Sequence, residues 1–122
     1  MVFIADPRDF PLWDDFVMSH PYGSVFHSAA WAEMLCKTFD YEPRYIVLNE
    51  GEKIKAALPF MAIKSRFTGN RLISLPRTSY CDPLVTSTED LIILLSFAQR
   101  LLSDEKLSFI EIKTQNNNAL LN

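Results

Sequence analysis

The sequence contains little glycine, little cysteine and no long hydrophobic run. Only 3 of its 122 residues are glycine and 2 are cysteine, so neither a glycine-rich phosphate-binding loop nor a disulfide framework is predicted. Cys36 and Cys81 form no Cys-x-x-Cys pair, and no zinc-ligand spacing surrounds them, so no metal site is expected. No apolar run reaches the roughly 18 residues of a membrane-spanning helix. The N-terminus lacks a basic region followed by an apolar core, so no signal peptide is predicted. These absences predict a cytoplasmic protein without a membrane span.

Acidic residues are missing from one stretch of the chain. Between Lys53 and Cys81 there are six basic residues and no Asp or Glu, whereas the rest of the chain carries six basic and fifteen acidic groups. A basic stretch on an acidic protein would attract an anionic partner such as a phosphorylated lipid precursor or RNA. Solvated strand edges, on which lysines discourage edge-to-edge pairing, explain the lysines equally well. Because Arg77 lies inside a loop, it favours the first explanation, binding of an anionic partner.

The residues that are abundant indicate one folded domain. Hydrophobic residues make up 48% of the chain, with nine Phe and two Trp, which is enough for a modest core. Apolar periodicity predicts helices over 9–18, 28–39 and 88–103, with Asp9, Ser28 and Thr88 as their N-caps. Strands are predicted over 44–49, 54–63, 71–75 and 108–114. This order predicts an α/β (α+β) fold, an antiparallel meander with flanking helices and then a helical crossover.

Some residues in these elements allow sharper expectations. Trp31 lies on the apolar stripe of its helix and is predicted to be a core anchor rather than a ligand contact. Pro59 cannot donate a ladder hydrogen bond, so its strand is expected to be an edge or to carry a bulge. Ile92, Ile93 and Phe97 extend the apolar stripe of the helix over 88–103 beyond what packing on one sheet requires. That excess predicts a surface that a second domain or a second copy covers.

The loop Ser74-Leu-Pro-Arg-Thr-Ser-Tyr-Cys-Asp-Pro-Leu84 carries the most chemistry. Its two prolines fix their own φ angles and favour extended conformations in the residues before them. Binding groups often lie on such loops at strand ends, although local chemistry alone favours an ordinary connection. The candidate substrate-binding residues are Arg77 as an anion contact, Tyr80 as a proton donor or hydrogen-bond partner, and Asp82, which would orient an amine or fix the loop. A Cys81 nucleophile with His27 as its base is the weaker hypothesis, because nothing in the sequence activates the thiol.

Three short motifs, in this order, resemble the FemAB-related family, which comprises peptidoglycan-bridge aminoacyltransferases built on the GNAT acyltransferase fold. The motifs are Val25-Phe-His-Ser-Ala-Ala-Trp31, Ala57-Leu-Pro-Phe60 and Tyr80-Cys-Asp-Pro-Leu84, the last with cysteine where glycine is usual. The resemblance runs from about Leu12 to Thr114. It implies an enzyme that transfers an aminoacyl or acyl group to an amine. It also implies that residues 1–122 form one incomplete N-terminal GNAT-like unit, whose catalytic residues the sequence does not identify.

The resemblance further implies what the unit would bind. Gln115-Asn-Asn-Asn118-Ala-Leu120 stands where a coenzyme A enzyme of this fold carries glycines, and Leu120 would hinder a phosphate. No cofactor is therefore expected. The expected partners are an anionic substrate (a lipid-linked precursor or an aminoacyl-tRNA) and a second GNAT-like domain or a second copy in a homodimer. The alternative is a non-catalytic α/β interaction module that self-associates.

Overall fold

Three helices and two small sheets make up the fold of the computed structural model, which describes residues 1–64, 69–74 and 82–112 apart from the side chain of Phe109. The strands are β1 (Val2–Ala5), β2 (Glu42–Pro43), β3 (Tyr45–Glu50), β4 (Lys53–Leu58), β5 (Met61–Ile63), β6 (Arg71–Ile73) and β7 (Phe109–Glu111). The helices are α1 (Trp13–Ser19), α2 (Ala29–Phe39) and α3 (Thr88–Asp104), with short 3-10 turns η1 (Pro7–Asp9) and η2 (Val25–His27). The mixed α/β class is confirmed.

The two sheets share one bent hairpin. One sheet has the strand order β1-β3-β4 and the other β2-β5-β6-β7. The pair β3–β4 continues into the pair β2–β5, and the Arg44 N–H donates to the Phe60 carbonyl at 2.8 Å where the two sheets meet. The strand predicted over 54–63 is therefore divided at Pro59, which has no N–H to donate. Described strand pairs are antiparallel except β6–β7, which is parallel. The predicted helical crossover is α3, which connects these two strands.

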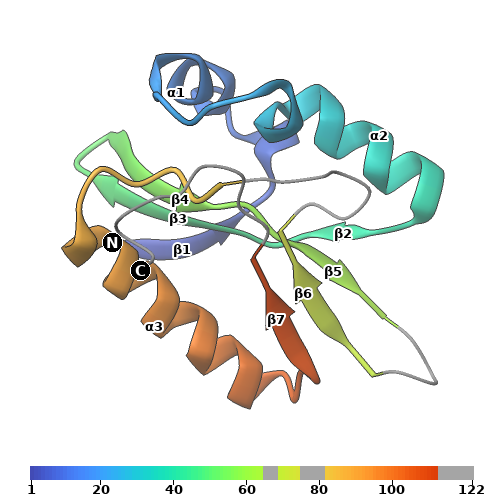
Figure 1. Ribbon diagram of the computed structural model, residues 1–122. Helices are drawn as coiled ribbons and strands as arrows, with labels where there is room; N and C mark the ends of the chain where they lie inside the picture. The colour runs from blue at the N-terminus through green and yellow to red at the C-terminus, as the bar shows by residue number, and fades with distance from the viewer. Residues whose placement is uncertain (65–68, 75–81, 113–122) are drawn as a thin grey trace.

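Helices lie on both sides of the sheets, so the fold has three layers. Figure 1 shows α1 and α2 over one face and α3 over the other. Alternate residues of β3 point to opposite faces, as a strand requires. Tyr45 and Val47 pack with α1 and α2 in the first core, whereas Ile46 and Leu48 pack with α3 in the second. In the described ranges, no helix has the length and apolar character needed to cross a membrane.

One predicted helix start and one further predicted N-cap were wrong, whereas α3 begins at Thr88 as predicted. The first long helix begins at Trp13 rather than near Asp9, because Phe10 is extended (φ −110°, ψ 101°), as the residue before a proline tends to be. The side chain of Asp6 caps the short turn η1 instead. Helix α3 is capped by Ser87, whose hydroxyl accepts the Asp90 N–H at 3.2 Å, and not by Thr88. Ser28 does cap α2, as predicted.

The prediction that Trp31 anchors the core is only partly correct, because Trp31 packs against the first core without being fully buried. Its side chain is only partly buried, packed edge-on against Phe26 with ring centroids 5.0 Å apart. The buried face of α2 is instead centred on Ala32 and Leu35, both 0% exposed. The largest buried side chain on this side of the sheets is Trp13, at 1% exposure.

The predicted apolar surface on α3 is only partly correct. Ile92 and Ile93 are exposed, at 56% and 42%. Phe97 packs partly against the second core, and the Arg100 guanidinium lies 5.4 Å from the centre of its ring. The exposed apolar surface of this helix therefore consists of the two isoleucines.

Candidate functional site

The chemically rich loop after β6 is described only at its two ends. At the first end, Ser74 is buried, and its N–H donates to the Glu111 carbonyl of β7 at 2.8 Å. At the second end, Asp82 is 1% exposed, and Leu84 is fully buried. Arg77, Tyr80 and Cys81 lie outside the described residues. Of the three candidate substrate-binding residues, only Asp82 is therefore described, as part of the interior.

The segment 82–84 is fastened to the rest of the fold on two sides. Leu84 and Ala57 of β4 exchange two backbone hydrogen bonds, of 3.0 and 2.9 Å. On the other side, Nε2 of His27 lies 2.8 Å from the Asp82 carbonyl oxygen. These contacts bring together the three motifs of the sequence, since His27 belongs to the first, Ala57 to the second, and Asp82 and Leu84 to the third.

His27 is fully buried and engaged at both ring nitrogens. Its Nδ1 lies 3.1 Å from the Ser24 backbone nitrogen and 2.8 Å from the Ser24 hydroxyl, in a capping box around η2. Because the Ser24 N–H can only donate, Nδ1 must accept, and the ring proton is then on Nε2, where it is donated to Asp82. Burial lowers the pKa of His27, so the ring is neutral near pH 7.

This geometry argues against His27 as a general base. A base for a Cys81 thiol needs a ring nitrogen that is free to take a proton. One ring nitrogen of His27 already accepts from Ser24, and the other already donates to Asp82. The arrangement fits a structural role for His27 at the start of α2. Within the described ranges, no group of three or more His, Cys, Asp or Glu residues is placed to hold a metal ion.

A second buried histidine lies beside the first. His20 ends α1, and its Nδ1 accepts the Tyr22 N–H at 3.1 Å. Its Nε2 is buried near the backbone of Val85 without a well-formed hydrogen bond. Burial lowers the pKa of His20 as well. Two neutral histidines therefore occupy the interior between α1, η2 and the segment 82–85.

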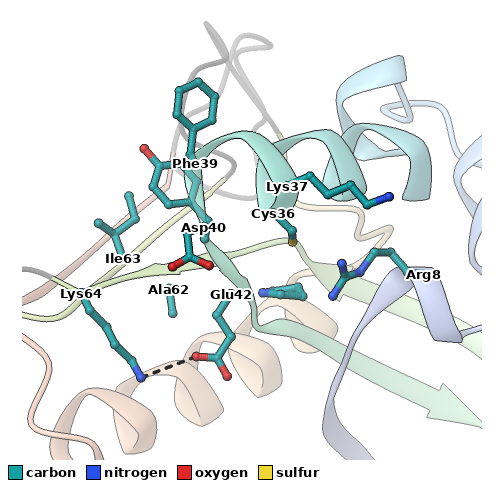
Figure 2. Close-up of a pocket in the computed structure, with 11 residues that line it drawn as sticks. Arg8, Cys36, Lys37, Phe39, Asp40, Glu42, Ala62, Ile63 and Lys64 are labelled. Atoms are coloured by element: carbon teal, nitrogen blue, oxygen red, sulfur yellow. Dashed lines mark ion pairs between the residues drawn. The ribbon is translucent and has the colours of Figure 1, made fainter.

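A cavity lies elsewhere, at the C-terminal end of α2. It has a volume of about 620 Å³ and is bordered by α2, β2, β5 and Arg8 of η1 (Figure 2). It is lined by Arg8, Cys36, Lys37, Phe39, Asp40, Tyr41, Glu42, Pro43, Ala62, Ile63 and Lys64. Charges of both signs face it, so a polar ligand that itself carries both charges would fit its chemistry.

Most charges around this cavity already have partners in the protein. Arg8 pairs with Asp6 at 2.7 Å, and this contact raises the pKa of Arg8 and lowers that of Asp6. Lys64 lies 3.8 Å from Glu42. Burial raises the pKa of the Cys36 thiol, which makes it a poor nucleophile at neutral pH. The cavity thus offers shape and polarity, but none of its described groups is activated for catalysis.

Sequence reasoning missed this cavity for a physical reason. Its lining comes from η1, the end of α2, β2 and β5, which are separate segments without a shared motif. One local signal was available: Asp40 adopts a left-handed conformation (φ 58°) as it ends α2, and Asp tolerates that conformation better than most residues. This signal predicts a sharp exit from the helix, but it does not predict a pocket.

The basic stretch of the sequence is partly neutralised in the fold. Lys55 of β4 lies 3.3 Å from both Glu50 and Asp90, and these carboxylates raise its pKa. Lys64 contacts Glu42. Lys53 is exposed at the turn between β3 and β4. The described lysines therefore fit solvated strand edges with local ion pairs, and attraction of an anionic partner remains a prediction for Arg77.

The fold is similar to that of a protein of known structure, FemX. The crystal structure of FemX matches 80% of this chain with a TM-score of 0.64 and 22% sequence identity. The chain spans only 23% of the length of FemX. No protein-family model and no curated protein matches this sequence. The similarity therefore establishes a FemX-like fold.

Proposed function

We propose that the protein is the first GNAT-type unit of a Fem-like transferase that passes an aminoacyl or acyl group to an amine. The observation that carries this proposal is the FemX-like fold over 80% of the chain. The meeting of the three motifs at the segment 82–84 supports it, because the loop that bears Arg77 and Tyr80 ends there. A second GNAT-type unit would supply the remaining wall of the substrate cleft.

In this reaction the amine attacks the carbonyl carbon of an activated ester, and the alcohol oxygen leaves after a tetrahedral oxyanion has formed. The amine loses a proton and the leaving oxygen gains one. The protein has to align the two reactants and stabilise the oxyanion. Arg77 would hold the anionic part of a substrate, and Tyr80 would donate a proton or a hydrogen bond. Because Asp82 is buried, we assign it to fixing the loop rather than to orienting the amine.

The proposal is tested with the complete gene product, by measuring transfer of a labelled aminoacyl group from aminoacyl-tRNA to a peptide amine. Loss of charge-assisted hydrogen bonds in Arg77→Ala is expected to raise KM for the anionic substrate by about 10- to 100-fold. Arg77→Lys should lie between this variant and the natural protein, because lysine keeps the charge and loses the planar fork. Lys53→Ala, which removes an exposed cation from β4, should leave KM unchanged.

Two results would contradict the proposal. One is an absence of transfer to any amine by the folded complete product. The other is an equal effect of Lys53→Ala and Arg77→Ala, which would point to general charge attraction rather than to binding by the loop. A reading frame that continues into a second GNAT-type unit after Asn122 would support an enzyme, whereas a stop codon would favour the second candidate function.

The second candidate is a non-catalytic module that self-associates through α3. It is favoured by the exposed Ile92 and Ile93, and by β7, which forms one edge of its sheet in the described residues. Such edges and apolar surfaces are often covered by a second copy. Phe97→Glu is a poor test, because Phe97 packs against the core. Ile92→Glu is expected to weaken a dimer measured by light scattering, and Thr38→Glu on the exposed side of α2 is its matched control.

A further inference from the structure

The two hydrogen bonds of His27 make different demands on its protonation state. The Nε2–H donation to Asp82 would survive in the charged ring, which carries a proton on both nitrogens. The hydrogen bond from the Ser24 N–H to Nδ1 would be lost, because a protonated Nδ1 is itself a donor and would face the Ser24 N–H across 3.1 Å. The Ser24 hydroxyl can rotate to accept from a protonated Nδ1, but the backbone N–H cannot. Protonation therefore costs the capping box one hydrogen bond.

The surroundings of His27 also disfavour a charge on its ring. The residue is 0% exposed. Among the described residues, the nearby carboxylate of Asp82 favours the imidazolium, and His20, if it were protonated, would oppose it. Desolvation outweighs the help from Asp82, so the native state favours the neutral ring. A protonated His27 is stabilised most easily by a conformation in which the ring reaches water.

A ring that moves into water withdraws its hydrogen bond from Asp82. The segment 82–84 would then keep the two backbone bonds between Leu84 and Ala57 and would lose the hydrogen bond from His27 of η2. The loss falls at the point where the loop that bears the candidate substrate-binding residues rejoins the described fold. The attachment of this segment is thus coupled to one proton.

We propose that His27 is a proton-sensitive anchor, which in its neutral form holds the segment 82–84 against the start of α2 and which loosens that segment when it is protonated. The inference goes beyond the proposed transferase activity, and its tests do not require that activity. The sign of the effect follows from linkage. A histidine whose native pKa lies below its unfolded value of 6.5 contributes stability that is fully present above this pH. That contribution is lost as the pH falls toward the native pKa.

The first test is an NMR titration of the ring nitrogens in the natural protein. At neutral pH we expect a proton on Nε2 and none on Nδ1, with a ring pKa below 6.5 for His27. A proton on Nδ1 at neutral pH would overturn the assignment of the two hydrogen bonds. A ring pKa at or above 6.5 would overturn the coupling. Neither outcome depends on whether any variant folds.

The second test follows hydrogen exchange of the Leu84 amide relative to that of Ile46 in the central strand β3. Exchange rates are first corrected for intrinsic exchange. Once His27 is protonated, the Leu84 amide should exchange about tenfold faster relative to Ile46, because a tenfold change in the opening equilibrium corresponds to the loss of one net hydrogen bond. His27→Gln keeps an amide donor for Asp82 and does not titrate, so it should abolish the pH dependence of this ratio. His20→Gln is the matched control and should preserve it. A pH dependence that disappears in His20→Gln, or persists in His27→Gln, would refute the proposal.

Discussion

Trp13 and Trp31 look equivalent in the sequence, but replacing each by phenylalanine is expected to change the free energy of unfolding by different amounts. Trp13 is 1% exposed, and its Nε1–H donates to the His27 carbonyl at 2.7 Å. Its ring meets the ring of Tyr45 nearly perpendicularly, at a centroid distance of 5.2 Å. Trp31 is only partly buried, and its Nε1 is buried without a hydrogen-bond partner. The same substitution therefore removes a hydrogen bond at Trp13, whereas at Trp31 it removes only a donor that makes no hydrogen bond.

The magnitudes follow from this difference. Trp13→Phe leaves a void and withdraws a donor from the His27 carbonyl, so we expect it to lower the free energy of unfolding by about 2–4 kcal/mol. Trp31→Phe removes a donor that the fold does not satisfy, so its effect should lie within about 1 kcal/mol of zero. Trp31→Ala should cost less than the roughly 3–5 kcal/mol expected for a fully buried aromatic side chain.

Urea unfolding followed by far-ultraviolet circular dichroism measures these changes without depending on tryptophan fluorescence. The slope of the unfolding free energy against urea should be unchanged, so that a shift in midpoint reports stability alone. Trp31→Ala, measured in the same way, also reports how much area its ring buries. A loss in Trp31→Phe equal to that in Trp13→Phe would refute the assignment of Trp13 as the anchor of this core.

Two further pairs of substitutions test local geometry. In Gly23→Ala the new Cβ would collide with the Val17 carbonyl oxygen, so a loss above about 2 kcal/mol is expected, whereas Gly51→Ala, at φ +65° with no neighbour within 4 Å, should cost only about 1 kcal/mol of backbone strain. Thermal or urea unfolding that ranks the two equally would contradict the close approach at Gly23. Ser87→Ala should lose about 1 kcal/mol of helix capping and Thr88→Ala much less. The reverse order in denaturant midpoints would show that the cap of α3 is misassigned.

Much of the fold could be predicted from sequence because local signals and tertiary packing agree. Ser28 caps α2, and the left-handed residue Asp40 ends it, so its start and its end are each determined by a single residue. Pro59 divides the long predicted strand where it cannot donate to a ladder. The parallel pairing of β7 with β6 follows from the intervening α3, since a parallel pair needs a long connection.

The failures arose where features other than apolar periodicity decide the structure. The start of α1 depends on Pro11 and on a turn that Asp6 caps with its own side chain, and helical periodicity does not detect that turn. The position of Trp31 depends on which face of α2 meets the sheets, and the small Ala32 allows that close approach. Periodicity predicts the width of an apolar stripe better than its centre.

The candidate site shows why motifs can identify a fold more securely than a reaction. His27 and Asp82 are separated by 55 positions in the sequence and joined by a hydrogen bond. Ala57 and Leu84 are joined by two more. The residues that carry the resemblance thus form one junction, where β4, the start of α2 and the end of the loop meet. A junction of this kind would be required by any protein with this arrangement, whether or not it transfers an acyl group. Evidence for the reaction must therefore come from residues that the junction does not use, and Arg77 is the first of these to test.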